Sequence, residues 1–87
     1  MSDYTPQQIL EGLTELVTEE TGLPAADIAP EKSFVEDLGI DSLSMMTIVV
    51  NAQDQFDVEI PDDDVAALKT VADAVDYIVK AQSGASV

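Results

Sequence analysis

The chain has 87 residues, enough for one small domain, and 46% of them are hydrophobic, which excludes a disordered acidic tail. It has no cysteine and no histidine, which excludes disulfide scaffolds, Cys-ligated zinc, HExxH-type sites and histidine-based catalytic triads. Eighteen acidic residues against three lysines give a net charge of −15, which favours a basic protein surface as partner over nucleic acid or an anionic membrane.

Targeting signals are not evident along the chain. No apolar run approaches the roughly 18 residues of a membrane span, and Met1–Tyr4 carries neither a basic region nor an apolar signal core. We therefore expect a cytoplasmic protein with no membrane partner. We also expect one domain over residues 1–82, followed by a flexible tail of small residues over 83–87.

The first predicted helix covers Pro6–Glu20. Thr5 suits its N-cap with Gln8 as capping-box partner, an apolar stripe follows, and Gly22 marks the end. The connection over 23–40 is long, but it carries spaced apolar anchors, so we expect it to pack on the core like an Ω-loop. The expected anchors are Ile28, Phe34, Val35 and Leu38, with one helical turn over 24–27.

Three further helices complete the predicted fold. The second covers Ser42–Phe56, a short third covers Asp62–Leu68, and the last covers Val71–Ala81, where Thr70 and Asp73 resemble a capping box. No pair of β-type runs joined by a hairpin turn is present. The sequence therefore predicts an all-α protein, a small four-helix bundle with three longer helices, one short one and a long structured loop.

The second helix carries two apolar stripes when its residues are placed at about 100° per residue. The longer stripe predicts the core-facing side. The shorter one lies near the N-terminal end and is either further core covered by the long loop or an exposed contact patch, a role that suits the adaptable Met46 thioether. The long stripe is Met45, Ile48, Val49, Ala52 and Phe56, and the short stripe is Leu43, Met46 and Val50.

The block over 34–43, which contains Asp-Leu-Gly and ends in Asp-Ser-Leu, resembles the acyl carrier protein family, as does the Ile60-Pro61 turn. The resemblance covers about Thr5 to Val79 and is nearest to discrete fatty-acid carriers of actinobacteria, including the mycolic-acid branch. It implies that a phosphopantetheinyl transferase attaches a 4′-phosphopantetheine arm from coenzyme A to Ser42. Asp41 is a helix cap, and the resemblance implies that it also helps to orient the transferase metal. The protein is then a carrier and not an enzyme.

The resemblance also implies a monomer whose second helix and preceding loop dock onto basic patches of acyl-chain elongation enzymes. Thr47 and Gln53 depart from the family, which usually has glutamate there, so we expect the short apolar stripe to carry more of the docking while acidic residues steer encounter. We interpret Asp62–Asp64 as a solvated helix start and not as a metal site. The predicted docking residues are Glu36, Asp37, Leu43, Met46, Val50, Asp54, Asp62 and Asp63.

In the family, acyl chains enter a cleft between the second and third helices, although the apolar composition here fits a closed core equally well. Two other functions stay open: a carrier for a polyketide or other specialised acyl pathway, and a small acidic helical inhibitor of a basic protein. In the second case the Asp41–Leu43 block is a coincidence. The cleft lining that the resemblance implies is Val49, Phe56, Ile60, Ala66 and Leu68.

Overall fold

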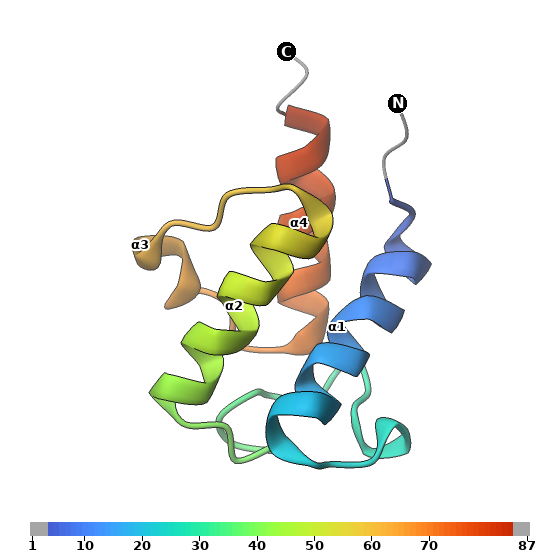
Figure 1. The fold of residues 1–87 in the computed structure, drawn as a ribbon, viewed down its shortest axis with the longest axis vertical. Coiled ribbons are helices and arrows are strands. Elements are labelled where there is room, and N and C mark those ends of the chain that lie inside the picture. Colours follow the sequence, from blue (N-terminus) through green and yellow to red (C-terminus); the bar gives the residue numbers. More distant parts are fainter. Residues whose placement is uncertain (1–3, 85–87) are drawn as a thin grey trace.

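Helices follow one another along residues 4–84, the part of the chain that the computed structural model describes (Figure 1). The predicted all-α fold with three longer helices and one short one is confirmed, and no strand occurs within 4–84. No helix there is long and apolar enough to cross a membrane. The predicted tail lies outside the described residues from position 85 onward. The elements are α1 (Pro6–Thr21), the 3-10 turn η1 (Ala25–Asp27), α2 (Ser42–Phe56), α3 (Asp62–Val65) and α4 (Val71–Gly84).

Both ends of α1 are closed by the predicted local signals. The Thr5 hydroxyl accepts a hydrogen bond from the Gln8 backbone N–H at 3.1 Å, and the Gln8 side chain accepts one from the Thr5 N–H at 2.9 Å. At the other end Gly22 adopts a left-handed conformation with φ 81°, and its N–H donates to the Thr18 carbonyl at 2.8 Å. A residue with a side chain is strained in that conformation, so Gly22 fixes where the helix stops.

The third helix is shorter than predicted. It ends at Val65 and does not reach Leu68, because the N–H groups of Ala67 and Leu68 bond to carbonyls three residues back, each at 3.0 Å. This tighter turn aims Leu68 into the core, where the side chain is 7% exposed. The prediction extended the helix to Leu68 because residues 65–68 are apolar, but the chain after Val65 turns towards the bundle.

The last helix is longer than predicted and ends at Gly84, not at Ala81. The capping box is confirmed, since the Thr70 N–H donates to Asp73 Oδ2 at 3.2 Å and the Asp73 N–H donates to the Thr70 hydroxyl at 3.1 Å. The extra turn is held by Gln82, whose side-chain amide accepts from the Tyr4 N–H at 3.1 Å and donates to the Tyr4 carbonyl at 2.5 Å. That pairing ties the end of α4 to the start of α1.

The core is formed by α1, α2, α4 and the long loop. The closest approach is at Gly12, where an added Cβ would lie 2.6 Å from Cζ of the buried Phe56 ring. The same ring meets Tyr4 edge-on, with centroids 5.1 Å apart. Because Gly12 has no side chain, α1 and α2 pack in direct contact. The largest fully buried side chains are Phe34, Ile9, Leu13, Ile40, Ile48, Ile78, Val17 and Val71.

The long loop between α1 and α2 is ordered by its anchors and by pairing with a distant part of the chain. Phe34 is 1% exposed and Ile28 6%, so these two anchors are confirmed, whereas Val35 is 66% exposed and that prediction is wrong. Ser33 and Thr70 form an isolated antiparallel bridge. The Phe34 N–H donates to the Lys69 carbonyl at 2.9 Å beside it. These bonds hold the loop against the start of α4.

Candidate functional site

Ser42 is the first residue of α2 and is exposed. Asp41 precedes it as the N-cap, and its carboxylate accepts a hydrogen bond from the Ser44 N–H at 2.9 Å. That bond lowers the pKa of Asp41, so the cap stays ionised at neutral pH. The Ser42 hydroxyl therefore stands in solvent at the positive end of a helix dipole, a position that favours an attached phosphate.

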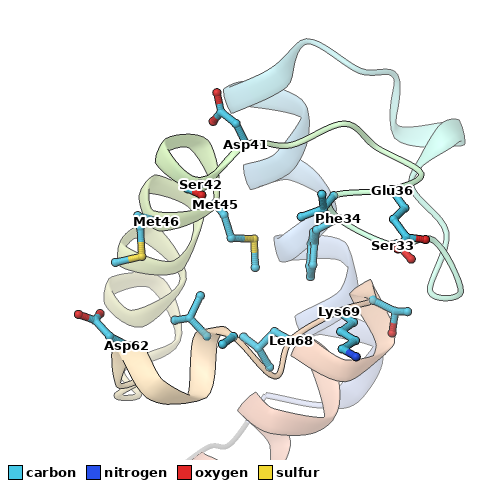
Figure 2. Close-up of a pocket in the computed structure, with 14 residues that line it drawn as sticks. Ser33, Phe34, Glu36, Asp41, Ser42, Met45, Met46, Asp62, Leu68 and Lys69 are labelled. Atoms are coloured by element: carbon cyan, nitrogen blue, oxygen red, sulfur yellow. The ribbon is translucent and has the colours of Figure 1, made fainter.

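A pocket of about 640 Å³ opens beside Ser42 (Figure 2). One side is formed by α2 with Met45 and Met46, and the facing side by the segment from α3 to Leu68 (Figure 2). Phe34, from the long loop, also lines the pocket (Figure 2). The middle is apolar, which suits a hydrocarbon ligand, while acidic groups stand at the rim. The charged and polar lining residues are Ser33, Glu36, Asp41, Ser42, Asp62, Lys69 and Thr70.

The predicted cleft lining corresponds to this pocket only in part. Ala66 and Leu68 line it. Val49, Phe56 and Ile60 do not line it and belong to the core, with 3%, 3% and 4% exposure. The Phe56 ring is occupied by its contacts with α1.

Sequence reasoning missed the contribution of the 33–36 segment and of Lys69 and Thr70 to the pocket. These residues come together through the Ser33–Thr70 bridge. No local periodicity signals such a pairing. The spaced apolar anchors, among them Phe34, indicated that the loop returns to the bundle but not which segment it pairs with.

The short stripe of α2 is exposed, so the reading of it as further core is wrong. Leu43 is 81% exposed, Val50 54% and Met46 37%, whereas the five residues of the long stripe are all buried. We call these three residues the apolar patch. Clustered apolar side chains on a small acidic protein typically mark an interaction site.

Thr47 and Gln53, the two positions where the sequence lacks the family's glutamate, use their side chains within the fold. The Thr47 hydroxyl donates to the Leu43 carbonyl at 3.1 Å, and the Gln53 side-chain oxygen Oε1 accepts from the Ile60 N–H at 2.8 Å. The α2 sequence therefore carries no charge from Ser42 to Gln53. The predicted acidic residues surround this neutral stretch, all of them exposed: Glu36, Asp37, Asp54, Asp62 and Asp63.

One of these acidic residues is partly engaged inside the loop. The Asp37 carboxylate accepts a hydrogen bond from the Ser33 N–H at 2.8 Å, which fixes the turn before α2. Across residues 4–84 no cluster of three or more acidic residues is arranged to hold a metal ion. The acidic groups near Ser42 thus present charge to the outside and form no chelating site in the described structure.

The chain is similar to known proteins over most of its length. A family model described as a phosphopantetheine attachment site matches residues 11–78. The acyl carrier protein of Micrococcus luteus is 64% identical over 77 residues, covering 88% of this chain and 95% of that protein. The acyl carrier protein of Myxococcus xanthus is 65% identical over 72 residues, covering 83% of this chain and 91% of that protein. A solved acyl carrier protein from Enterococcus faecalis has a TM-score of 0.77 at 31% identity, covering 90% of this chain and 99% of that one.

The exposed serine at the tip of α2 and the matched family define a phosphopantetheine-bearing carrier domain. The chain belongs to the acyl carrier protein family. Its similar members come mostly from actinobacteria, such as Micrococcus and Thermobifida. Members of this family are carriers and not enzymes. The residues present fit the prosthetic group, because Ser42 is exposed at a helix N-terminus, where a phosphate is favourably placed, and the chain has no cysteine thiol of its own.

Proposed function

We propose that Ser42 carries the 4′-phosphopantetheine arm and that the protein shuttles acyl chains, as thioesters on that arm, between enzymes of type II fatty acid biosynthesis. The observation that carries this proposal is the exposed Ser42 hydroxyl at the first position of α2, inside the matched span. The group supplies the thiol on which acyl chains travel. The proposal includes a monomer in the cytoplasm, as a carrier that visits many separate enzymes requires.

The residues around Ser42 have separate tasks in this function. Asp41 caps α2 and so fixes its first turn, with the Ser42 hydroxyl exposed to attack the phosphorus of coenzyme A. In this proposal the Asp41 carboxylate also helps to orient the metal of the transferase. Transfer forms a bond between Ser42 Oγ and the pantetheine phosphorus, and breaks the bond that joins this phosphorus to the rest of coenzyme A. The base that takes the proton belongs to the transferase, so Ser42 needs exposure and not activation.

Intact-mass spectrometry tests the attachment site. The purified chain, incubated with a phosphopantetheinyl transferase, Mg²⁺ and coenzyme A, should gain the mass of one arm. Ser42→Ala should gain none, and Ser44→Ala, a matched serine two residues further along the same helix, should gain it as the unmodified sequence does. Arm transfer to Ser42→Ala would refute the assignment. The absence of any gain in the natural sequence would favour the inhibitor alternative.

The pathway needs a second measurement. Acyl groups released from the carrier purified from its native host should be saturated or 3-oxo fatty chains if the pathway is fatty acid synthesis. Multiply oxygenated chains would instead favour the polyketide alternative. Mycolic-acid precursors, which are very long fatty chains, would place the carrier in that branch.

Docking combines the apolar patch with its acidic surroundings. We expect Met46→Ala to weaken binding to a ketosynthase by about five- to tenfold at every salt concentration, as for loss of an apolar anchor. Asp54→Asn should mainly slow association, with an effect that fades as salt rises. If binding vanished at moderate salt while Met46→Ala bound normally, the patch would not be the main contact.

A further inference from the structure

The segment over 60–70, which forms one side of the pocket, is fixed at both ends. At its start, the Ile60 N–H donates to the Gln53 side chain at 2.8 Å and the Ile60 side chain is buried. At its end, Leu68 is buried and the Lys69 carbonyl accepts from the Phe34 N–H at 2.9 Å. These anchors join the segment to α2 and to the long loop.

The part between the anchors is held much more weakly. It contains α3, a helix of 4 residues with no buried side chain and no side-chain cap. Val65 is half-buried against the core. In the fold, α3 lies at the edge of the molecule on the opposite side of α2 from α1 (Figure 1).

One side-chain hydrogen bond joins α3 to the long helix behind it. The Tyr77 hydroxyl, on α4, donates to Asp64 Oδ2 at 2.5 Å, and both side chains are half-buried. This bond, together with burial and the nearby negative charge, raises the pKa of Tyr77. The bond is therefore present at neutral pH with a donor that keeps its proton.

The weakly held α3 and its hydrogen bond to Tyr77 both bear on the size of the pocket. Asp62, Val65 and Ala66 line it from α3 and the turn after it, and Met45 lines it from α2. An outward swing of α3 about these anchors would widen the pocket without moving the buried side chains of α2. The energy that resists this motion is the packing of Val65 and the Tyr77–Asp64 bond.

We propose that Tyr77 is a positioning residue of the pocket: its hydroxyl holds α3 through Asp64, and this bond sets how readily the pocket opens for an apolar ligand. The proposal rests on the proposed function only for the nature of the natural ligand, an acyl chain on the Ser42 arm. The opening itself is a property of the chain without the arm and is tested there.

The first test is hydrogen exchange of the unmodified chain. Tyr77→Phe keeps the ring and removes the donor, so exchange of the Val65, Ala67 and Leu68 amides should accelerate about three- to tenfold, the factor that one net hydrogen bond provides. The amides of Ile9 and Ile48, in the core of α1 and α2, should not change. Unchanged exchange in α3, or equal acceleration in all helices, would overturn the proposal.

Variants of the acceptor separate the bond from the charge of α3. Asp64→Ala should reproduce the effect of Tyr77→Phe, and Tyr77→Phe should add nothing further in that background. Asp64→Asn keeps an acceptor oxygen and should leave α3 exchange closer to that of the natural chain. Asp63→Asn, which removes the same charge from the neighbouring residue, should not accelerate exchange. Acceleration by Asp63→Asn equal to that of Asp64→Ala would assign the effect to charge and overturn the proposal.

The second test measures the pocket directly with Nile red, a neutral apolar dye that avoids repulsion by the acidic chain. If a larger open fraction admits the ligand, the apparent affinity should rise by the factor found for α3 exchange. Tyr77→Phe and Asp64→Ala should both bind the dye about three- to tenfold more tightly. Faster α3 exchange with unchanged dye affinity would show that the bond holds α3 without controlling the pocket. Both outcomes are independent of arm attachment at Ser42.

Discussion

Toward α1, the helix α2 meets a neighbour so close that Gly12 has no room for a methyl group, whereas toward α3 it borders a pocket of about 640 Å³. The first contact buries the Phe56 ring to 3% exposure, whereas no side chain of α3 is fully buried. The difference shows that the contact with α1 fixes the position of α2, while the side of α2 that faces α3 is loosely packed and can adjust to a ligand. A carrier that takes up and releases cargo needs both properties in the same helix.

The largest effect should come from removing the tight contact. Phe56→Ala should cost about 3–5 kcal/mol of unfolding free energy, because a buried ring leaves a cavity. Met46→Ala, on the pocket side of the same helix, should change it by less than about 1 kcal/mol. Urea denaturation at moderate salt measures both. Equal losses would show that the two sides of α2 are equally well packed, and Phe56→Leu serves where Phe56→Ala does not fold.

A methyl group added at Gly12 tests the same contact from α1. Gly12→Ala should lower the unfolding free energy by about 1–3 kcal/mol, because overpacking against Phe56 outweighs the higher helix propensity of alanine. The smaller side chain of Phe56→Leu should reduce this penalty in the double variant, as expected for residues in contact. A stabilised Gly12→Ala protein would mean that the two helices separate without cost.

A substitution in α1, Thr18→Val, should have a smaller effect and should raise the unfolding free energy. The Thr18 hydroxyl is buried and has no hydrogen-bond partner among the described residues. Thr18→Val keeps the shape and removes the unpaired group, so the unfolding free energy should rise by about 1 kcal/mol. Thr14→Val is the matched control, because the Thr14 hydroxyl donates to the Leu10 carbonyl at 2.7 Å and its loss should bring no gain. Thermal denaturation separates the two, since a change of about 1 kcal/mol shifts Tm by several degrees in a domain of this size.

The smallest effect concerns the α3 side and appears only at high pH. In a Tyr4→Phe chain, Tyr77 is the remaining tyrosine, and its absorbance should titrate above the usual pKa of 10.0 because of the bond to Asp64. A raised folded-state pKa contributes stability that is fully present below the unfolded value and is lost as pH rises through the folded one. Asp64→Ala should return the titration towards its ordinary position. A midpoint that Asp64→Ala leaves unchanged would contradict the assigned cause.

Local chemistry was sufficient to predict most of the fold. Thr5 with Gln8, Asp41, and Gly22 each act on neighbouring N–H or C=O groups, so their roles can be read from a few adjacent residues. The helical period likewise separated the buried and exposed stripes of α2. The Asp-Ser-Leu block led to the attachment site by resemblance and not by calculation.

What failed depends on contacts between distant segments. The end of α3 is set by where Leu68 finds the core, and the length of α4 by the pairing of Gln82 with Tyr4. Val49, Phe56 and Ile60, predicted for the cleft lining, lie in the core and not on the pocket, because a resemblance between sequences does not show which apolar side chains face a cavity.

The bridge between Ser33 and Thr70 has an electrostatic consequence. It places the backbones of Lys32 and Lys69, two of the chain's three lysines, close together. The Lys32 carbonyl accepts a hydrogen bond from the Val71 N–H, and the Lys69 carbonyl accepts one from the Phe34 N–H. Two of the three lysines thus lie on adjacent backbone segments, where the carboxylates of Asp37 and Asp73 also accept backbone hydrogen bonds. Because Lys69 lines the pocket together with Glu36 and Asp41, a partner surface that covers the pocket meets charges of both signs.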